Sequence, residues 1–419
     1  RTCPIDGLRL LFDLCTKADE NYDFTKDKFS VEKRSERNEK HIMELMRPKR
    51  LCDGVLVSLA QHLGSKGLMK RIGLTDQNSL APRSVRDYFN LEPDQWAFGD
   101  CGAFSYASET EPTVSVEQAI ALYDLYEFDL GASVDHIPMK SVPTNDGKQL
   151  LTEYEQRRRI EITRDNADKF IRLHKERGAK FIPVGVIQGL GPRSFANQIG
   201  PYLDMGYRYL ALGGLVPRTD HMIREIIEAV DKELRRHSQK PKLHLFGIFR
   251  PSLQPLFKET GIGSFDSATY FRKAWLRSDQ NYLGTDGRWY AAIRVPPLRD
   301  PRIKLRLIDQ GKTETELERL EQNALKQLRL YAKKKIGLEI ALAAAVEYDS
   351  LLSRGELLDE KLITSYRTTL QARPWEKCGC PMCARLGIDI LIFRGKNRNK
   401  SRGAHNTLRL FETVNHSPK

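Results

Sequence analysis

Residues 181–188 are Phe181-Ile182-Pro183-Val184-Gly185-Val186-Ile187-Gln188, an apolar run of strand length. Such a run indicates a strand that is covered on both faces, as in a parallel sheet flanked by helices. The same pattern recurs on either side of this segment. The other strand-like segments are 54–59, 97–105, 131–136, 207–213, 243–248 and 263–268.

The segments between these runs carry helical periodicity, most clearly at 116–127, 151–175, 220–237 and 253–260. Strands that alternate with helices predict a parallel sheet, either doubly wound or closed into a barrel. No Gly-x-Gly-x-x-Gly motif opens a helix after the first strand, which disfavours a dinucleotide-binding fold. We therefore predict an α/β fold of the TIM (β/α)8 barrel type, which commonly spans about 250 residues.

Several of the predicted strands end in a polar or glycine-rich signature. Active sites of α/β barrels lie at the carboxyl ends of the strands, so these residues should converge although they are far apart in sequence. One carboxylate alone would more often be a helix cap or a turn residue. The residues at these ends are Asp100, Asp135, Gln188, Gly213, Gly214 and Asp266.

The composition divides the 419 residues into four parts. We predict an N-terminal segment at 1–50, a catalytic barrel at 51–300, a helical insertion at 301–373, and a zinc-binding subdomain with the closing segment at 374–419. The insertion is inferred from 312–354, which is rich in Leu, Ala, Glu and Lys and contains no Pro, as expected of a helical hairpin or bundle.

Three closely spaced thiols, Cys378, Cys380 and Cys383, are followed 22 residues later by His405. Cys3His is a common ligand set for tetrahedral zinc, whereas a disulfide would leave one thiol over. His416 is the alternative fourth ligand, because spacing alone does not fix the loop. A closed four-ligand shell leaves no open position, so we expect structural Zn2+ and place the chemistry elsewhere.

The chain has 68 Lys and Arg against 55 Asp and Glu, a formal charge of +13 that favours anionic partners, with nucleic acid first. No apolar run approaches the roughly 20 residues that span a bilayer, and no leader is recognisable, so we expect a cytoplasmic protein without a membrane partner. Two groups of cations are candidate phosphate contacts, the first beside aromatic residues and the second in a predicted flexible basic loop. They are Arg272 and Lys273, and Arg394, Lys396, Arg398, Lys400 and Arg402.

These motifs together resemble the guanine transglycosylases, which exchange a guanine base in tRNA for a 7-deazaguanine. The resemblance covers about residues 95–410 and is interrupted by the helical insertion. The cysteine cluster with its late histidine is similar to the zinc site of that family, whose fold is a TIM barrel with a zinc subdomain. The matching strand-end motifs are Asp100-Cys101-Gly102-Ala103-Phe104, Val186-Ile187-Gln188-Gly189, Gly213-Gly214-Leu215 and Phe265-Asp266.

The resemblance implies a role for each strand-end residue. Asp266 would attack C1′ of the sugar, and Asp100 would carry the proton of the departing and arriving bases. Asp135 would accept the N1–H and the amine of the base. Donors to its carbonyl would be Gln188 and the backbone N–H of Gly214, in the Gly213-Gly214-Leu215 loop, and the rings that would sandwich the base are Phe104 and Phe246.

Two departures point to a DNA-modifying branch of this family. Ser267-Ala268-Thr269-Tyr270-Phe271 replaces the Pro-Thr-Arg segment of the bacterial tRNA enzymes, and the helical insertion is additional. We therefore expect locally opened duplex DNA as substrate, with other proteins of a DNA-modification system as partners. Val216-Pro217-Arg218-Thr219 lacks the Glu found in enzymes that take an aminomethyl base, which favours preQ0 as the incoming 7-deazaguanine.

Two alternatives remain open. The first keeps the chemistry and changes the polymer to tRNA. The second is a non-catalytic, zinc-containing protein that only binds nucleic acid. The presence of both Asp100 and Asp266 argues against the second alternative, because a binding module does not need a paired nucleophile and acid.

Overall fold

The computed structural model describes residues 8–12, 16–33, 36–62, 84–144, 147–276, 279–300, 313–352 and 359–416. The chain forms two compact units. The barrel unit comprises Arg1–Cys15 and Cys52–Ala268, and the C-terminal unit comprises Thr16–Leu51 and Thr269–Lys419. Among the described residues, no helix combines the length and the apolar character needed to cross a bilayer.

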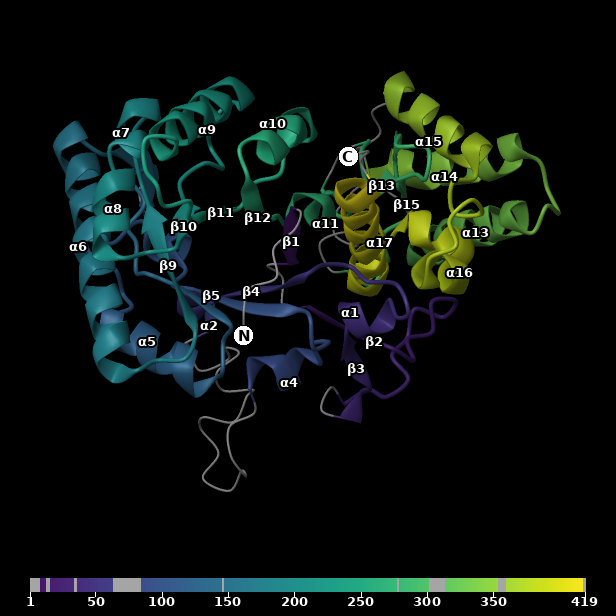
Figure 1. Ribbon diagram of the computed structural model, residues 1–419. Helices are drawn as coiled ribbons and strands as arrows, with labels where there is room; N and C mark the ends of the chain where they lie inside the picture. Colours follow the sequence, from purple (N-terminus) through teal and green to yellow (C-terminus); the bar gives the residue numbers. More distant parts are fainter. Residues whose placement is uncertain are drawn as a thin grey trace. The chain divides into compact units, whose positions relative to one another are not determined.

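The barrel unit is a closed barrel of parallel strands in the order β1-β12-β11-β10-β9-β6-β5-β4, with β4 pairing back onto β1 (Figure 1). This confirms the predicted TIM-type barrel. The strands are β1 (Arg9–Phe12), β4 (Gly54–Ser58), β5 (Trp96–Asp100), β6 (Leu130–Ala132), β9 (Ile182–Ile187), β10 (Tyr209–Leu212), β11 (Lys242–Leu245) and β12 (Ile262–Asp266).

Helices follow most of these strands, and four of them, α4, α5, α6 and α9, begin at a Ser or Thr side chain that caps them. Ser115 caps α5 and Thr152 caps α6, each in a reciprocal capping box with the third helical residue, and Gly178 ends α6 in the left-handed conformation. The larger helices are α5 (Val116–Leu125), α6 (Glu153–Arg177), α8 (Ile199–Met205) and α9 (Asp220–Leu234). Shorter ones are α2 (Leu59–His62), α4 (Val85–Phe89), η2 (Ala103–Tyr106), α7 (Pro192–Ala196), η3 (Pro251–Leu253) and α10 (Gln254–Glu259).

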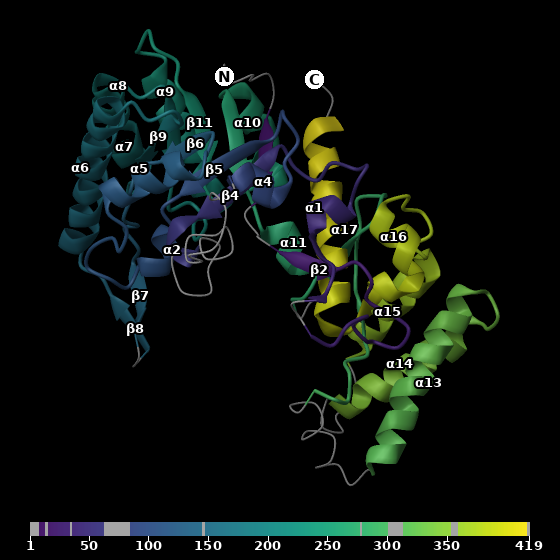
Figure 2. The ribbon, with the colours of Figure 1, turned by 90° about the horizontal axis from the view of Figure 1, so that it is seen from below.

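The interior of the barrel is filled by inward-pointing apolar side chains, as expected for a packed barrel. They include Leu56, Phe98, Val184, Val186 and Ala211, and Trp96, Ile182 and Phe246 pack against them. A hairpin of β7 (Ser141–Thr144) and β8 (Gly147–Leu150) lies between β6 and α6, and Figure 2 shows it projecting from the barrel unit.

The C-terminal unit is mostly helical. The predicted helical hairpin is present, because α13 (Glu314–Ala332) packs against α14 (Leu338–Leu352) (Figure 2). The other helical elements are α1 (Ile42–Leu45), α11 (Thr269–Lys273), α15 (Glu360–Ala372), α16 (Pro381–Leu386), η4 (Gly387–Leu391) and α17 (Gly395–His416). Short strand pairs are β2 (Lys17–Asp19) with β3 (Glu39–His41), β13 (Tyr282–Leu283) with β14 (Trp289–Tyr290), and β15 (Ile293–Arg294) with β16 (Ile392–Phe393).

The units do not follow the predicted boundaries of 1–50 and 51–300. Strand β1 lies within the first fifty residues and hydrogen-bonds to both β4 and β12, so the N-terminal segment closes the barrel. Residues 16–51 and those after Ala268 belong to the C-terminal unit. A strand completed by partners distant in sequence cannot be separated from the sheet that it closes.

Candidate active site and metal centre

The strand-end residues singled out in the sequence lie at the carboxyl-terminal end of the barrel. Asp100 is the last residue of β5 and Asp266 the last of β12, whereas Asp135, Gln188 and Phe246 follow β6, β9 and β11. The structure therefore places these residues where barrel enzymes carry their active sites. Their individual roles remain predictions.

Asp135 is a buried acceptor in this group. Its Oδ1 accepts a hydrogen bond from Cys101 Sγ at 2.9 Å, and its Oδ2 accepts one from Gln188 Nε2 at 2.6 Å. The Tyr106 hydroxyl donates to the backbone carbonyl of Asp135 and lies 2.9 Å from Sγ of Cys101. Burial raises the pKa of the Asp135 carboxyl, and its two side-chain donors oppose this shift. In the free site, both carboxylate oxygens of Asp135 therefore already accept hydrogen bonds from neighbouring side chains.

Asp100 lies opposite Ser58 in the register of β4 and β5, and its Oδ2 accepts a hydrogen bond from Gly102 N at 3.1 Å. Burial and the neighbouring negative charge of Asp135 raise the pKa of Asp100 to about 8, and the charge of Asp266 acts in the same direction. Asp100 is therefore mostly protonated at neutral pH. A protonated carboxyl at this position can donate a proton to a departing base.

Asp266 is buried, and its hydrogen bonds are unevenly distributed. Oδ1 accepts one from Gly247 N at 2.8 Å and one from His244 Nε2 at 3.1 Å. Among the residues that the structure describes, none donates to Oδ2. One oxygen of this carboxylate is thus held by the protein, and the other is available to a ligand.

Two glycines permit close packing of the loops that follow β9 and β10. A Cβ on Gly213 would lie 2.2 Å from Gln188 Nε2, and one on Gly214 would lie 2.7 Å from Gln188 Oε1. Gly214 also has φ of +66°, a conformation that other residues rarely adopt. The side chain of Leu215 is fully buried beside them. The predicted Gly-Gly-Leu loop therefore lies directly against the predicted Gln-Gly turn.

Two arginines each connect two neighbouring loops at this end of the barrel by donating to backbone carbonyls. Arg159 of α6 donates to the carbonyls of Ala107 and Ile137, which follow β5 and β6. Arg218 donates from Nη2 to Gly189 O at 2.6 Å, and from Nε to Gly214 O at 3.0 Å. Neighbouring loops around the site are thus connected in pairs, which preorganises the residues that they carry.

The two aromatic rings predicted to sandwich the base differ in their surroundings. Phe104, in η2, exposes 53% of its surface, so its face is open to a ligand. Phe246 is half-buried, and its ring centroid lies 5.9 Å from that of Phe98 in the barrel core. Both rings remain candidates for stacking.

The three cysteines and His405 form one buried cluster in the C-terminal unit. The Sγ atoms of Cys378, Cys380 and Cys383 lie 3.4–3.5 Å from His405 Nδ1. His405 Nε2 lies 2.7 Å from the carbonyl of Leu283, to which it must donate, so Nδ1 carries the lone pair that a metal needs. The four ligand atoms lie within 4.8 Å of one another, which suits a metal ion and suggests zinc.

The ligand set is supported by its neighbours. The Tyr282 ring stacks on His405 with centroids 4.0 Å apart, and its hydroxyl lies 3.2 Å from Cys383 Sγ. Cys380 also caps α16. The alternative ligand His416 is the last residue of α17, the helix that carries His405, and its side chain is outside the described part of the chain.

The prediction of a flexible basic loop at 394–402 is wrong. These residues enter and form the first turns of α17, and Arg394, Arg398 and Arg402 are buried. Arg394 and Arg398 both pair with Asp27, and Arg402 donates to the carbonyl of Ala274. Cations with buried protein partners are not available to phosphates, so these three arginines hold the C-terminal unit together.

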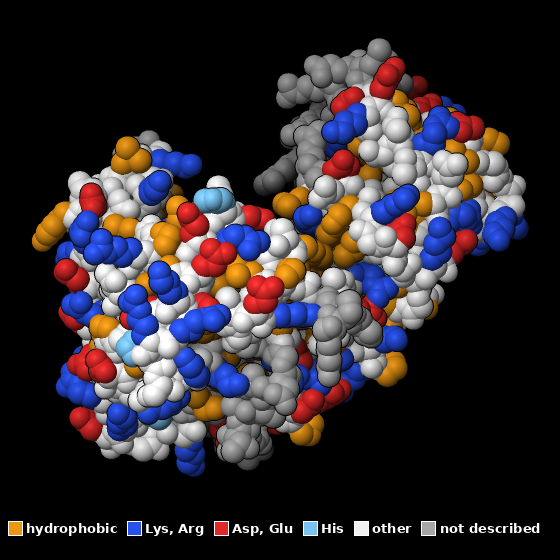
Figure 3. Space-filling model, turned by 45° about the horizontal axis from the view of Figure 1, so that its top comes forward, with side chains coloured by type: hydrophobic (Ala, Val, Ile, Leu, Met, Phe, Trp, Pro, Cys, Tyr) orange, Lys and Arg blue, Asp and Glu red, His pale blue; other side chains and the backbone are white. Residues whose placement is uncertain are grey.

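The other proposed phosphate contacts differ in exposure. Arg272 and Lys396 are exposed, whereas Lys400 is half-buried and donates to the carbonyl of Lys17. Lys273 Nζ lies 4.1 Å from the centre of the Trp289 ring. On the face in Figure 3, Lys and Arg side chains are interspersed with Asp and Glu side chains. A phosphate-binding role for these four cations stays a prediction.

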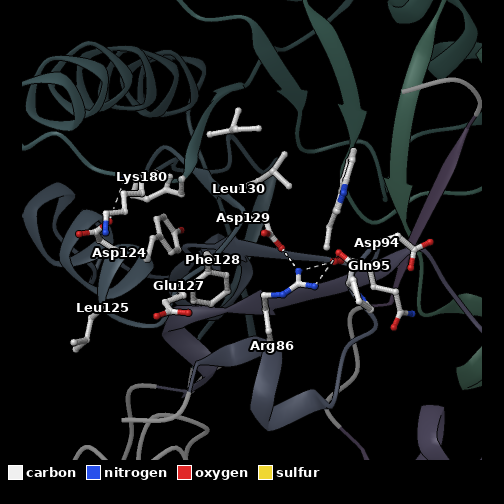
Figure 4. Close-up of a pocket in the computed structure, with 15 residues that line it drawn as sticks. Arg86, Asp94, Gln95, Asp124, Leu125, Glu127, Phe128, Asp129, Leu130 and Lys180 are labelled. Atoms are coloured by element: carbon white, nitrogen blue, oxygen red, sulfur yellow. Dashed lines mark hydrogen bonds and ion pairs between the residues drawn. The ribbon is translucent and has the colours of Figure 1, made fainter. Parts of the chain in front are cut away.

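A cavity of about 670 Å³ lies at the opposite, amino-terminal ends of β5, β6 and β9. Charged residues that line this cavity pair with one another. Arg86 pairs with Asp129 at 2.6 Å and donates to the carbonyl of Gln95 (Figure 4). Residues at this end of a barrel typically serve stability, so we place the chemistry at the other end.

Sequence reasoning missed His244, Ser264 and Tyr209, which are buried next to Asp266. The signal that could have found them is a polar residue inside an otherwise apolar strand, since barrel interiors are dominated by branched apolar side chains. Each of the three lies on a strand that the sequence analysis had assigned.

No family model matches the chain. A DNA-guanine transglycosylase from Salmonella montevideo is 34% identical over 370 residues, which cover 87% of this chain and 86% of that protein. The chain belongs to the guanine transglycosylase family. The present chain is also 27% identical to a tRNA-guanine(15) transglycosylase from Nanoarchaeum equitans (strain Kin4-M). That match runs over 183 residues, which cover 41% of this chain and 38% of that protein.

Family membership confirms the resemblance inferred from the strand-end motifs, and it makes the chain an enzyme. One residue of the Asp100–Phe104 motif is a cysteine that takes part in the site. Cys101 donates to Asp135 and lies against the Tyr106 hydroxyl. A thiol thus belongs to the hydrogen-bond network of the candidate base pocket.

Proposed function

We propose that this transglycosylase exchanges guanine in DNA for preQ0, a 7-deazaguanine with a nitrile substituent, through a covalent intermediate on Asp266. The observation that carries the proposal is the similarity along 87% of the chain to a protein named DNA-guanine transglycosylase. The match to a tRNA enzyme covers only 41% of the chain. DNA is therefore the better supported polymer.

Exchange of a base at the same carbon with retained configuration requires two displacements. In the first, Oδ2 of Asp266 attacks C1′, the C1′–N9 bond breaks with its electron pair moving to the guanine, and Asp100 gives its proton to the departing base. In the second, N9 of preQ0 attacks C1′, the bond to Asp266 breaks with its electrons returning to the carboxylate, and Asp100 takes up the proton of the incoming base. At the end of the two steps, Asp266 is again a free carboxylate and Asp100 is again protonated.

The two carboxyl groups suit these different tasks. Asp100 has a pKa raised to about 8 and so holds a proton at neutral pH. Asp266 presents Oδ2 without a hydrogen bond from any residue in the described part of the chain, while its Oδ1 is fixed by two donors. A nucleophile with one oxygen oriented and the other available is positioned for in-line attack.

Recognition of the base would centre on Asp135, a buried acceptor that suits the N1–H and amine of a guanine-type base. Gln188 and Gly214 N–H would donate to the base carbonyl, and Phe104 and Phe246 would stack on the ring. In duplex DNA the guanine must first leave the helix stack, at a cost of a few kcal/mol, so the duplex must open locally.

The nitrile is favoured by Arg218, which donates to two of the three backbone carbonyls of the Gly-Gly-Leu loop. Its Nε donates to Gly214 O at 3.0 Å, and its backbone N–H donates to Leu215 O at 3.0 Å. A cationic aminomethyl tail would need a free acceptor, whereas a nitrile needs none. A neutral substituent therefore fits this loop better.

We assign the Cys3His cluster to structural Zn2+. Bound zinc would connect α16 to α17 and so contribute to folding, with no open position for chemistry. We further propose that the enzyme works in the cytoplasm with other proteins of a DNA-modification system, because its proposed substrate is DNA.

The decisive test is incubation of the enzyme with radiolabelled guanine and either duplex DNA or bulk tRNA. We expect label to enter DNA, and unlabelled preQ0 to displace it. Asp266→Ala should incorporate none. Label that enters tRNA alone would overturn the choice of polymer, and label that enters neither would favour a protein that only binds nucleic acid.

A further inference from the structure

A chain of hydrogen bonds runs inside the barrel to the carboxylate of Asp266. His244 Nε2 lies 3.1 Å from Asp266 Oδ1, and His244 Nδ1 lies 2.8 Å from Ser264 Oγ. Ser264 Oγ lies 2.7 Å from the hydroxyl of Tyr209. All four side chains are buried, and His244 has no exposed surface.

The chemistry of the end group determines the direction of these bonds. An ionised carboxylate can only accept, so His244 must carry its proton on Nε2 and donate it to Asp266. Nδ1 faces Ser264 Oγ, a hydroxyl that can either donate to it or accept from it, and Ser264 in turn lies within hydrogen-bond distance of Tyr209. These contacts hold the imidazole so that Nε2–H points at Asp266.

Two aromatic rings hold the imidazole in place. The centroids of Phe98 and Phe246 lie 5.0 and 4.7 Å from that of His244, both with edge-on geometry. This apolar enclosure excludes water and strengthens the hydrogen bond to Asp266. It also connects His244 to Phe246, the proposed stacking residue.

Both donors to Asp266 contact the same oxygen. His244 Nε2 and Gly247 N bind Oδ1, so rotation of the carboxylate would cost two hydrogen bonds. Oδ2 is therefore the oxygen that carries neither of these two bonds. This asymmetry distinguishes the oxygen that can form a bond to the sugar from the oxygen that cannot.

We propose that His244 is a positioning residue that holds Oδ1 of Asp266 so that Oδ2 attacks the sugar, and that then promotes release of this carboxylate. The proposal rests on the proposed role of Asp266 as nucleophile. In the ester, Oδ2 is bonded to C1′ and Oδ1 is a neutral carbonyl oxygen. When the incoming base attacks, the C1′–Oδ2 electrons return to the carboxylate, and the bond from His244 strengthens as Oδ1 becomes charged.

The two half-reactions should therefore respond differently to loss of this donor. A hydrogen bond to the carboxylate stabilises the free form relative to the ester. Because Gly247 N still binds Oδ1 when His244 is lost, the ester should form at a similar rate but should be released more slowly, so that the covalent adduct accumulates. A purely structural role predicts instead that adduct and exchange fall together.

The test compares wild type, His244→Phe and His244→Gln. Each is mixed with guanine-containing DNA and preQ0 and quenched in denaturant, and the DNA-linked protein is measured beside the rate of exchange. For His244→Phe we expect exchange to fall about 10-fold or more, as for loss of one hydrogen bond to a charged group, while the adduct fraction rises. His244→Gln keeps an N–H donor and should restore release toward the wild-type rate.

The same experiment separates this proposal from the proposed function. Absence of an adduct with wild type, or an adduct that persists in Asp266→Ala, would overturn the nucleophile and the His244 proposal together. A wild-type adduct that depends on Asp266, with His244→Phe lowering adduct and exchange alike or changing neither, would overturn the His244 proposal alone.

Ser264→Ala provides a second variant in case the buried His244→Phe fails to fold. It removes the hydroxyl that is hydrogen-bonded to His244 Nδ1 and leaves His244 and Asp266 in place. We expect a smaller rise in adduct fraction in the same direction. Unchanged adduct and exchange in a folded Ser264→Ala, with no rescue by His244→Gln, would contradict the proposal.

Discussion

Gln188 donates its side-chain amide to Asp135, with 2.6 Å between Nε2 and Oδ2. The bond joins the loops that follow β9 and β6, and both side chains are buried. Gln188 Oε1, on the same amide, is buried and accepts no hydrogen bond from the described residues. An incoming base would replace the hydrogen bond between Gln188 and Asp135 and could also bond to Oε1 of Gln188. The hydrogen bond thus keeps the two polar side chains of the pocket in place in the free enzyme.

The first prediction concerns Asp135. Asp135→Asn replaces an acceptor-only carboxylate by an amide, which leaves one donor facing the N–H groups of the base. We expect the KM for guanine to rise roughly 10- to 100-fold, the range for loss of a hydrogen bond to a charged group. The measurement is incorporation of labelled guanine at varied base concentration.

Asp165→Asn, on the exposed surface of α6, is the matched control and should leave KM unchanged. Hypoxanthine lacks the amine of guanine. The substitution Asp135→Asn should therefore raise the KM for hypoxanthine by a smaller factor than the KM for guanine. Equal KM for guanine in wild type and variant would remove Asp135 from base recognition.

The second prediction concerns the Cys3His cluster. Purified protein should carry about one zinc, and Cys380→Ser should lose both the metal and thermal stability, because binding free energy at such a site is folding free energy. Metal content is measured by elemental analysis, and stability by thermal unfolding. Cys52→Ser, at a buried cysteine of the barrel unit outside the cluster, is the control and should retain its zinc. Stability that survives full metal removal would contradict a structural ion.

The barrel strands were predictable from sequence because each is a local run of apolar residues. Strand β1 was not, since its four residues adjoin a charged segment and its partners are β4 and β12. The catalytic end was predictable for the same reason, because polar residues directly after apolar runs must share one rim. His244 was not, because its meaning depends on Ser264 and Asp266, which only the closed barrel brings beside it.

The basic segment at 394–402 shows a different limit. Arg394, Arg398 and Arg402 are spaced four residues apart, which is the spacing of one helix face, so the helical signal was present. Their burial could not be inferred, because Asp27, the partner of Arg398, lies 371 positions away in the sequence. Charge alternation alone does not distinguish a solvated loop from a buried network.

The third prediction follows from this network. Arg398 pairs with Asp27 and Asp389, and Arg398→Met would leave both carboxylates without that partner. We expect a loss of about 3–5 kcal/mol in the free energy of unfolding, as for removal of one partner from a buried ion pair. Chemical denaturation measures this change.

Lys396→Met is the control, because Lys396 is exposed on the same helix and should change stability by less than about 0.5 kcal/mol. If Lys396 contacts a phosphate, this control should also reduce the slope of log affinity for DNA against log salt by up to about 0.9. Similar stability of the two variants would contradict a structural role for Arg398.

The fourth prediction concerns the pH dependence of the first half-reaction. Burial and the charge of Asp135 raise the pKa of Asp100 to about 8, so the acid form needed to protonate the departing guanine is present below pH 8 and lost above it. Adduct formation in a single turnover should therefore fall as pH rises through about 8. Asp100→Asn cannot donate that proton and should be roughly 10²- to 10⁴-fold slower, with no inflection near pH 8.

The same shift predicts an effect on stability with a definite sign. Because the pKa of Asp100 is higher in the folded state than in the unfolded state, folding favours the protonated carboxyl, and this stabilisation is lost as pH rises from about 4 to about 8. Asp100→Asn removes the titrating group, so relative to wild type the variant should be more stable at pH 9 than at pH 5. Thermal unfolding at both pH values measures this difference. A wild-type adduct rate that stays constant from pH 6 to pH 9 would remove Asp100 as the acid, whatever the stability data show.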